Sequence, residues 1–303
     1  MSFALLLLLC VSQLTEALKL VSLGDWGTAQ TLTQAHLNDY IRDDKPDAVL
    51  LLGDNFYVKG VTSVHDPQFN SKFQVPFKDV PCGFYVCAGN HDWYGNATAE
   101  VAYTSADHSK RWRFPALYHE QMFKGADGVK VRVVFVDTWM LNGGDTILAY
   151  ANGRFSLSES GLQAAVAAGD VTPDVADALR AEHGAKPAVE AEADWAQYAW
   201  LDKVLAQGGA DWTLVCGHFP VRSASRQEHG DTANLVHDLD PLLRAHGVHA
   251  YLSGHDHILQ HIQHQGTLSY FGSGAGAKTH DKIVDAYDGL RSSVTGAYGY
   301  VRL

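Results

Sequence analysis

The chain has 303 residues, 46% of them hydrophobic, and a formal net charge of −11 at pH 7. This composition is sufficient to bury a substantial core, and the length fits one large domain or two small ones. The acidic balance argues against nucleic acid as the main partner, because binding to a phosphate backbone needs clustered Lys and Arg.

Residues 1–17 are predicted to form a secretory signal peptide. The apolar run at 3–11 is shorter than the roughly 20 residues that span a bilayer. Thr15 and Ala17 place small residues at the two positions that a signal peptidase inspects, so the mature chain is expected to begin near Leu18. A buried N-terminal helix or an uncleaved anchor is the alternative. We therefore expect a protein that is secreted, or delivered to a lysosome or vacuole, with no later membrane span.

Five apolar runs are each followed by Gly and a polar cluster. Near-continuous apolar runs of this length are typical of strands that are buried on both faces. The Gly after each run allows a tight turn and keeps a side chain out of a crowded site. Every cluster lies beyond the carboxyl end of its strand, where ligands collect in parallel sheets. The runs are 19–23, 48–52, 83–88, 212–216 and 248–253, and the clusters are 24–27, 53–57, 89–92, 217–220 and 254–257.

A helix is predicted between the first two runs, over residues 31–43, with Pro46 as a stop signal after it. Together the three elements form a β-α-β unit. Further strands are expected over 129–136, 257–264 and 267–271.

Residues 158–206 differ in character, because they are rich in Ala, Glu and Asp at helical spacing. Two or three surface helices are expected there, the last over about 189–205, and about 158–191 is interpreted as a helical insertion. No low-complexity tract marks a linker, so a single domain over 18–303 is favoured.

Three cysteines remain after the signal peptide, which would remove Cys10. An odd number cannot all pair within one chain. Cys87 and Cys216 lie in apolar runs, so buried free thiols are predicted. A Cys82–Cys87 disulfide is the alternative.

The polar clusters supply oxygen and imidazole ligands, which suit iron, zinc and manganese. They are sufficient for two ions if one carboxylate bridges them, and two metals about 3.5–4 Å apart clamp the attacking and leaving oxygens of a phosphoryl transfer. A single Gly-Asp or Gly-His is better explained by an ordinary turn. Five such clusters in this order, each at a strand end, indicate a metal site. The candidate ligands are Asp25, Asp54, Tyr57, Asn90, His218, His255 and His257.

The five clusters resemble those of the metallophosphoesterase superfamily, and specifically of the purple acid phosphatases. Tyr57 discriminates, because the related Ser/Thr phosphatases carry Gly-Asp-x-x-Asp-Arg-Gly where this chain has Gly-Asp-Asn-Phe-Tyr. The Glu-His-Gly segment at 228–230 is similar to that of the small, tartrate-resistant branch. The resemblance covers about 18–303 and implies a calcineurin-like catalytic domain with an α/β fold: a four-layer α/β/β/α sandwich of two mixed sheets flanked by helices.

The resemblance also implies two metal ions bridged by Asp54: Fe(III) and a divalent ion, Fe(II) or Zn(II), with Mn as a further candidate. A trivalent ion acidifies its bound water strongly, so metal-bound hydroxide would attack phosphate monoesters at low pH. The remaining iron ligands would be Asp25, Tyr57 and His257, and the remaining ligands of the divalent ion would be Asn90, His218 and His255.

His91 and His229 are the predicted catalytic residues. His91 adjoins the ligand Asn90 and is placed to bind the phosphate or to protonate the leaving alkoxide. His229 is a second candidate, although the spacing from Gly-His-x-Pro to Glu-His-Gly is about two residues longer here than in the family. Asn96 opens the sequon Asn-Ala-Thr and is expected to be glycosylated in a secreted chain.

The predicted function is an acid phosphatase that acts on small phosphate monoesters or phosphoproteins. One alternative is a Mn- or Zn-dependent phosphodiesterase or nucleotidase of the same superfamily, against which Tyr57 argues. Another is a secreted iron-binding protein that uses the same site, against which the complete ligand set and His91 argue. A plain extracellular interaction domain would leave the seven ligands unexplained.

Overall fold

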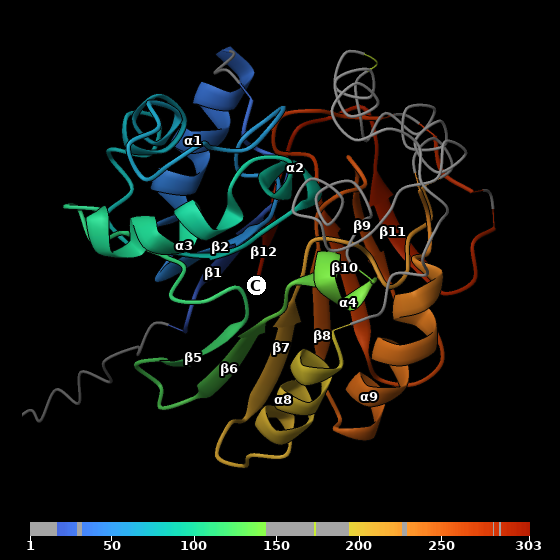
Figure 1. The fold of residues 1–303 in the computed structure, drawn as a ribbon. Helices are drawn as coiled ribbons and strands as arrows, with labels where there is room; N and C mark the ends of the chain where they lie inside the picture. Colours follow the sequence, from blue (N-terminus) through green and yellow to red (C-terminus); the bar gives the residue numbers. More distant parts are fainter. Residues whose placement is uncertain are drawn as a thin grey trace, which may run out of the picture.

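The computed structural model describes residues 17–28, 32–143, 194–225, 229–280, 282–284 and 286–303, together with Pro173. The predicted signal peptide, except for Ala17, and the predicted insertion at 158–191, except for Pro173, lie outside the described residues. The chain forms two sheets with helices packed against them (Figure 1). None of the described helices combines the length and the apolar character that a membrane span requires.

The first sheet has five strands in the order β12-β1-β2-β3-β4. Its centre consists of the first three predicted apolar runs, which pair in parallel. At the edges, β12 is antiparallel to β1, and β4 is parallel to β3. The strands are β1 (Leu20–Leu23), β2 (Ala48–Leu52), β3 (Gly83–Cys87), β4 (Trp112–Arg113) and β12 (Val301–Arg302).

The second sheet has seven strands in the order β11-β9-β10-β8-β7-β6-β5. Its four central strands, β10, β8, β7 and β6, run parallel, while β5, β9 and β11 are antiparallel to their neighbours. The strands are β5 (His119–Lys124), β6 (Lys130–Phe135), β7 (Trp212–Cys216), β8 (Ala250–Ser253), β9 (Leu259–Ile262), β10 (Ser269–Ser273) and β11 (Leu290–Val294).

The parallel strands are buried on both faces, as their apolar runs predict. In β2, Leu50 packs in the core between the two sheets, whereas Leu51 packs in the core on the outer face of the five-stranded sheet. In β7, Leu214 packs between the sheets and Val215 packs on the outer face of the seven-stranded sheet. Successive side chains of a strand point to opposite faces, so each central strand contributes to two hydrophobic cores.

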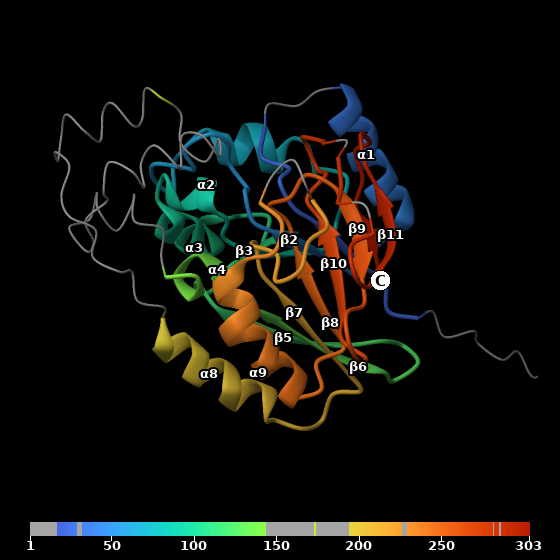
Figure 2. The same ribbon diagram turned by 90° about the vertical axis from the view of Figure 1, so that its right-hand side faces the viewer.

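Helices cover the two outer faces. Leu37 of α1 packs against the five-stranded sheet, and Leu201 of α8 and Leu243 of α9 pack against the seven-stranded sheet (Figure 2). This arrangement confirms the predicted four-layer α/β/β/α sandwich. The helices are α1 (Leu32–Asp44), η1 (Phe69–Gln74), α2 (Asn90–Trp93), α3 (Ala97–Ala106), α4 (Thr138–Leu141), α8 (Trp195–Leu205), η2 (Leu235–Leu239) and α9 (Asp240–Ala245).

The cysteines agree with the favoured prediction. Cys82, Cys87 and Cys216 are free thiols, and Cys87 and Cys216 are buried. Burial raises the pKa of the Cys82 thiol to about 11. A thiol that stays protonated is a poor nucleophile, so these cysteines are expected to be inert.

The buried His119 makes the stability of the fold depend on pH. Its ring stacks on Phe135 and lies 3.0 Å from the carbonyl oxygen of Val86, and burial lowers its pKa from 6.5 to about 4. Below pH 6.5 the unfolded chain binds a proton that the folded chain does not, so stability is full above pH 6.5 and is lost as pH falls toward 4.

Replacing this ring with a group that does not titrate should flatten the pH dependence. Between pH 7 and pH 4.5, the free energy of unfolding of the native protein should fall by about 2 kcal/mol more than that of His119→Gln. Urea unfolding of both metal-free proteins at the two pH values measures the difference. Equal losses in the two proteins would show that His119 does not cause the acid sensitivity.

Candidate metal centre

The carboxyl ends of five parallel strands bring all seven predicted ligands to one region between the two sheets. Six of the seven are buried, and His255 is partly exposed. Strand β1 is followed by Asp25, β2 by Asp54 and Tyr57, β3 by Asn90, β7 by His218, and β8 by His255 and His257.

Three of these side chains form a triangle of donor atoms. The Tyr57 hydroxyl donates to Asp25 Oδ1 at 2.9 Å and lies 3.2 Å from His257 Nε2. The third side, from His257 Nε2 to Asp25 Oδ1, is 3.3 Å. The triangle joins residues that are more than 230 positions apart in sequence, because β1 and β8 end at the same place.

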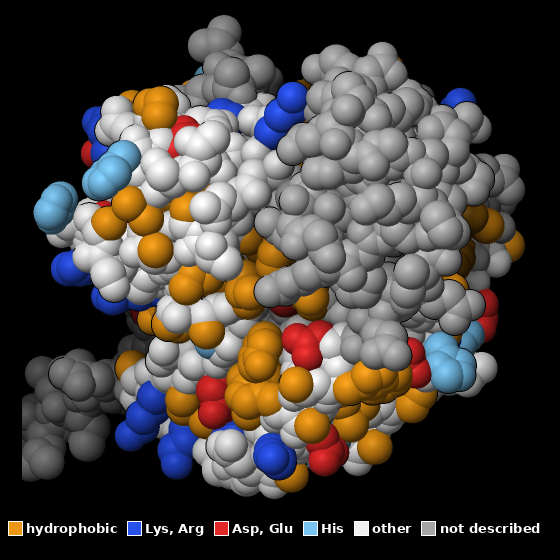
Figure 3. Space-filling model, viewed as in Figure 1, with side chains coloured by type: hydrophobic (Ala, Val, Ile, Leu, Met, Phe, Trp, Pro, Cys, Tyr) orange, Lys and Arg blue, Asp and Glu red, His pale blue; other side chains and the backbone are white. Residues whose placement is uncertain are grey.

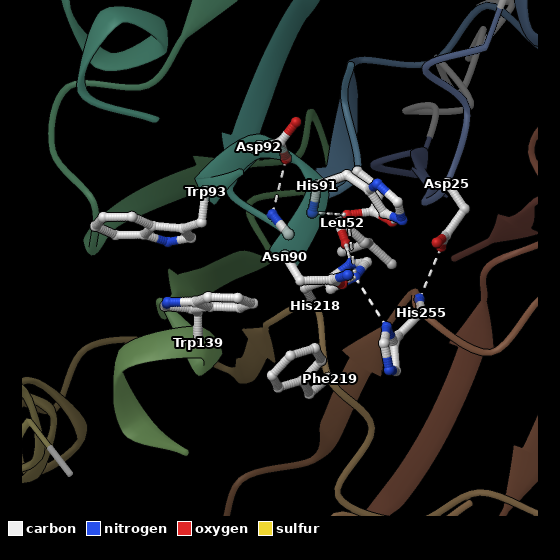
Figure 4. A network of polar contacts seen from close by, with 12 residues as sticks. Asp25, Leu52, Asn90, His91, Asp92, Trp93, Trp139, His218, Phe219 and His255 are labelled. Carbon is white, nitrogen blue, oxygen red and sulfur yellow. Dashed lines mark hydrogen bonds and ion pairs between the residues drawn. The ribbon is translucent and has the colours of Figure 1, made fainter. Parts of the chain in front are cut away.

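A second group of donors surrounds His218 Nε2. This nitrogen lies 2.9 Å from Asn90 Oδ1 and 3.2 Å from His255 Nδ1 (Figure 4). It also lies 3.4 Å from Asp54 Oδ1. The other ring nitrogen of His218, Nδ1, lies 2.8 Å from the carbonyl oxygen of Leu52, which fixes the ring so that Nε2 faces the centre.

The two donor groups fit two metal ions. Neighbouring donors on an ion with bonds of about 2.0–2.2 Å lie roughly 2.9–3.5 Å apart, and the two groups have this spacing. Ligand atoms of Asp25, Asp54 and His218 also lie within 4.8 Å of one another, so Asp54 is close to both groups. The geometry therefore suits a bridging carboxylate at Asp54.

The protonation states of Asp54 and His255 suit metal binding, whereas a metal would have to displace a proton from Tyr57. Burial alone would raise the pKa of Asp54, but His218 and His91 hold it below its ordinary value, so the carboxylate stays ionised. Burial and neighbouring imidazoles, chiefly His229, lower the pKa of His255 well below 6.5, which keeps the ring neutral as a ligand must be. Burial and the charges of Asp25 and Asp54 raise the pKa of Tyr57 well above 10, so a bound cation is needed for ionisation of the phenol.

The backbone around the ligands is unusual. Asp25, Asp54 and His255 adopt the left-handed region, with φ of 60°, 52° and 69°. Residues other than Gly rarely adopt this conformation, and such strain is concentrated at functional sites. Each of the three directly follows a Gly, so the turn is made within two residues of the strand end.

Two of the Gly residues before the clusters allow the strand ends to touch. A Cβ atom on Gly89 would lie 2.3 Å from Asp54 Oδ1, and one on Gly254 would lie 2.5 Å from Asp25 Oδ2. The expectation that Gly keeps side chains out of a crowded site is confirmed at these positions.

Asp92 holds two of the ligand loops together rather than facing the centre. Its carboxylate accepts hydrogen bonds from the backbone N–H groups of Gly89 at 2.8 Å, Asn55 at 3.1 Å and Phe56 at 3.0 Å. The loop that carries Asp54 and the loop that carries Asn90 are thereby fixed to each other.

The predicted catalytic histidines lie on different sides of this arrangement. His91 Nδ1 lies 2.6 Å from the carbonyl oxygen of Val58, and Nε2 lies 3.8 Å from Asp54 Oδ2, so Nε2 faces the centre. His229 Nδ1 lies 3.0 Å from His255 Nε2. Each histidine therefore lies beside a predicted ligand: His229 contacts His255, and His91 faces Asp54, the predicted bridging carboxylate.

Two supporting residues were not predicted from the sequence. The Thr138 hydroxyl accepts hydrogen bonds from the backbone N–H groups of His218 at 3.1 Å and Phe219 at 2.9 Å. The Tyr94 hydroxyl accepts a hydrogen bond from Asn90 Nδ2 at 3.2 Å, which leaves Oδ1 of the amide directed at His218. The only signal for Thr138 is its place after β6, a strand end without a Gly.

Residues 18–259 match the calcineurin-like phosphoesterase family. The chain is 35% identical to tartrate-resistant acid phosphatase type 5 of Homo sapiens over 324 residues, which covers 99% of this chain and 88% of the relative. It is 27% identical to purple acid phosphatase 17 of Arabidopsis thaliana, over 85% of this chain and 68% of the relative. In fold it resembles GAP50, an anchor in the inner membrane complex of Plasmodium, with a TM-score of 0.69 and 19% identity over 95% of this chain and 81% of that one.

Proposed function

Since the chain belongs to the calcineurin-like phosphoesterase family and, within it, to the purple acid phosphatases, we propose that it hydrolyses phosphate monoesters at a dinuclear Fe(III)–M(II) centre. The divalent ion would be Fe(II) or Zn(II), with Mn as a further candidate. The observation that carries the proposal is the pair of donor groups that meet at Asp54, one of which contains a Tyr hydroxyl.

The Tyr oxygen favours a trivalent ion in one of the two positions. The group of Tyr57, Asp25 and His257 offers two anionic oxygens in addition to Asp54, once the phenol has ionised. The group of Asn90, His218 and His255 offers an amide oxygen and two imidazoles, which suit a divalent ion once the proton that Asp54 favours on His218 has left. When bound, the two ions would supply Lewis acidity that neutralises the phosphate and activates water.

His91 would act on the leaving group. Because its Nδ1 is directed at the carbonyl oxygen of Val58, its Nε2 is left to meet the substrate beside Asp54. A protonated Nε2 would donate to a phosphate oxygen or to the departing alkoxide. His229 would instead hold the ring of His255, because their nitrogens are 3.0 Å apart. This assigns His229 a positioning role.

Removal of the His91 imidazole should slow catalysis without emptying the site. We expect kcat of His91→Asn to fall roughly 10²- to 10³-fold, as is usual for loss of a general acid, with the metal content unchanged. The matched control is His108→Asn, since His108 is exposed and lies away from the clusters. A variant with native kcat would exclude His91 from proton transfer.

The substrate class can be tested directly. We expect the purified protein to hydrolyse an aryl phosphate monoester much faster than the matching diester, with the optimum in the acid part of a range of about pH 4 to 8. Faster hydrolysis of the diester would support the phosphodiesterase hypothesis. Rapid hydrolysis of nucleoside monophosphates alone would support the nucleotidase hypothesis. A protein that binds iron and turns over no ester would support the iron-binding reading.

The net charge of −11 agrees with small or protein-borne phosphate esters as substrates rather than with nucleic acid. On the face drawn in the space-filling view, the Lys and Arg side chains lie in several separate places rather than in one patch (Figure 3). Long phosphate backbones require gathered positive charge, so we do not propose nucleic acid as a partner.

We also propose that the protein enters the secretory pathway and carries a glycan on Asn96. The side chain is exposed, and its Oδ1 accepts a hydrogen bond from the backbone N–H of Ala99 at 3.0 Å at the start of α3. The cap uses the oxygen of the amide, so the nitrogen is left for the sugar. Protein from the culture medium of a eukaryotic host should lose mass on treatment with an N-glycosidase, and Thr98→Ala should not.

A further inference from the structure

A lysine lies over the ring of the predicted iron ligand. Lys278 Nζ is 4.2 Å from the centroid of the Tyr57 ring. A cation within about 6 Å of an aromatic centroid is attracted by the negative face of the ring. None of the five clusters contains Lys278, which follows the Gly-rich segment after β10.

The backbone on both sides of Lys278 is hydrogen-bonded to segments that carry predicted ligands. Gly276 N–H donates to the carbonyl oxygen of Gly24 at 3.2 Å, and His280 N–H donates to that of His257 at 3.0 Å. The His280 ring also stacks on the His257 ring, with centroids 5.2 Å apart and an interplanar angle of 10°. The backbone at Lys278 is therefore held by contacts two residues away in each direction.

The surroundings of the Tyr57 hydroxyl are negatively charged, so a cation nearby is attracted to them. The hydroxyl lies beside the carboxylate of Asp25, and Asp54 adds a second negative charge nearby. Among the described residues, the Lys278 ammonium makes no ion pair with a carboxylate, and its Nζ lies over the ring. Lys72 is also close, but its ammonium is used in hydrogen bonds to the Tyr57 carbonyl oxygen and to Gln68 Oε1, both at 2.7 Å.

We propose that Lys278 is a positioning residue that stabilises negative charge on the Tyr57 side chain and so tunes the phenolate–iron bond. The inference rests on the proposed function, because it takes Tyr57 as a ligand of Fe(III). The visible absorption band of such a site arises from a transition in which an electron passes from the phenolate to the iron. A cation over the ring stabilises the electron on the phenolate, so it increases the energy of that transition.

The test is the position of the visible band in three variants. Lys278→Met, which removes the charge at similar length, should shift the band to longer wavelength by on the order of 10 nm. Lys278→Arg should restore it to within a fraction of that shift. The matched control is Lys282→Met, four residues along the same segment and also exposed, which should leave the band in place.

Each outcome decides for or against the inference. An unmoved band in Lys278→Met, or an equal shift in Lys282→Met, would overturn it, and so would loss of iron from both Lys278 variants. Loss of iron from Lys278→Met alone, with iron retained in Lys278→Arg, would support a requirement for the charge. A native protein that is colourless with two metals bound would contradict the proposed Fe(III) site instead.

Discussion

Asp54→Asn should abolish catalysis. The side chain is 2% exposed, and its Oδ1 lies 3.4 Å from His218 Nε2 and accepts a hydrogen bond from the His91 N–H at 3.0 Å. An amide fits the same space, but it lacks the charge that holds two cations together. Loss of a bridging charge should lower kcat/KM by at least ~10³-fold, with fewer than two metals bound per chain.

The comparison with a surface carboxylate isolates this effect. Asp79 has an exposed side chain, so Asp79→Asn removes the same charge at a distance from the centre. It should retain full turnover and two metals per chain. A folded Asp54→Asn protein that kept both metals and turned over substrate within tenfold of native would show that Asp54 does not bridge the ions.

Gly89→Ala should disable the centre through a single methyl group. A Cβ atom there would lie 2.3 Å from Asp54 Oδ1, 2.4 Å from the Asp54 backbone nitrogen and 2.9 Å from His218 Cε1. Contacts this short force the two loops apart. We expect a loss of about 2–4 kcal/mol in the free energy of unfolding, at and above the usual range for overpacking. We also expect fewer than two metals bound per chain.

The matched control is Gly208→Ala, because a Cβ atom at Gly208 would meet nothing within 4 Å. Chemical denaturation and metal analysis of the two variants give the comparison. If Gly89→Ala were as stable and as well loaded as Gly208→Ala, the loops would have more freedom than the close approach of Gly89 and Asp54 implies.

The residues that meet at the candidate centre were predictable because their clusters follow a strong local signal. Asp54 and His255 directly follow a Gly that ends a buried apolar run, and the order of the runs fixes which ends meet. The central strands were predictable for the same reason. The helix predicted over 31–43 is α1, shifted by one residue. The helix predicted over about 189–205 is α8, which ends as predicted but begins only at Trp195, with Asp194 as its cap.

The edge strands and several supporting residues could not be predicted, because no local pattern marks them. Strand β5 alternates buried and exposed side chains that include polar residues, and β12 has only two residues. Asn96 could have signalled α3, since Asn is a common helix cap, but its sequon suggested only a glycan. Lys278 and Thr138 reach the centre through tertiary contacts that sequence spacing does not encode.

The visible absorption spectrum of the metal-loaded protein, recorded beside that of Tyr57→Phe, tests the central claim most directly. The hydroxyl of Tyr57 lies 2.9 Å from Asp25 Oδ1 and 3.2 Å from His257 Nε2. These distances match the spacing of neighbouring donor atoms on one metal ion. We predict a broad visible band in the native protein that is absent from Tyr57→Phe. An active native protein that holds two metals and has no visible band would contradict the Fe(III)–phenolate centre and would favour a manganese or zinc phosphoesterase.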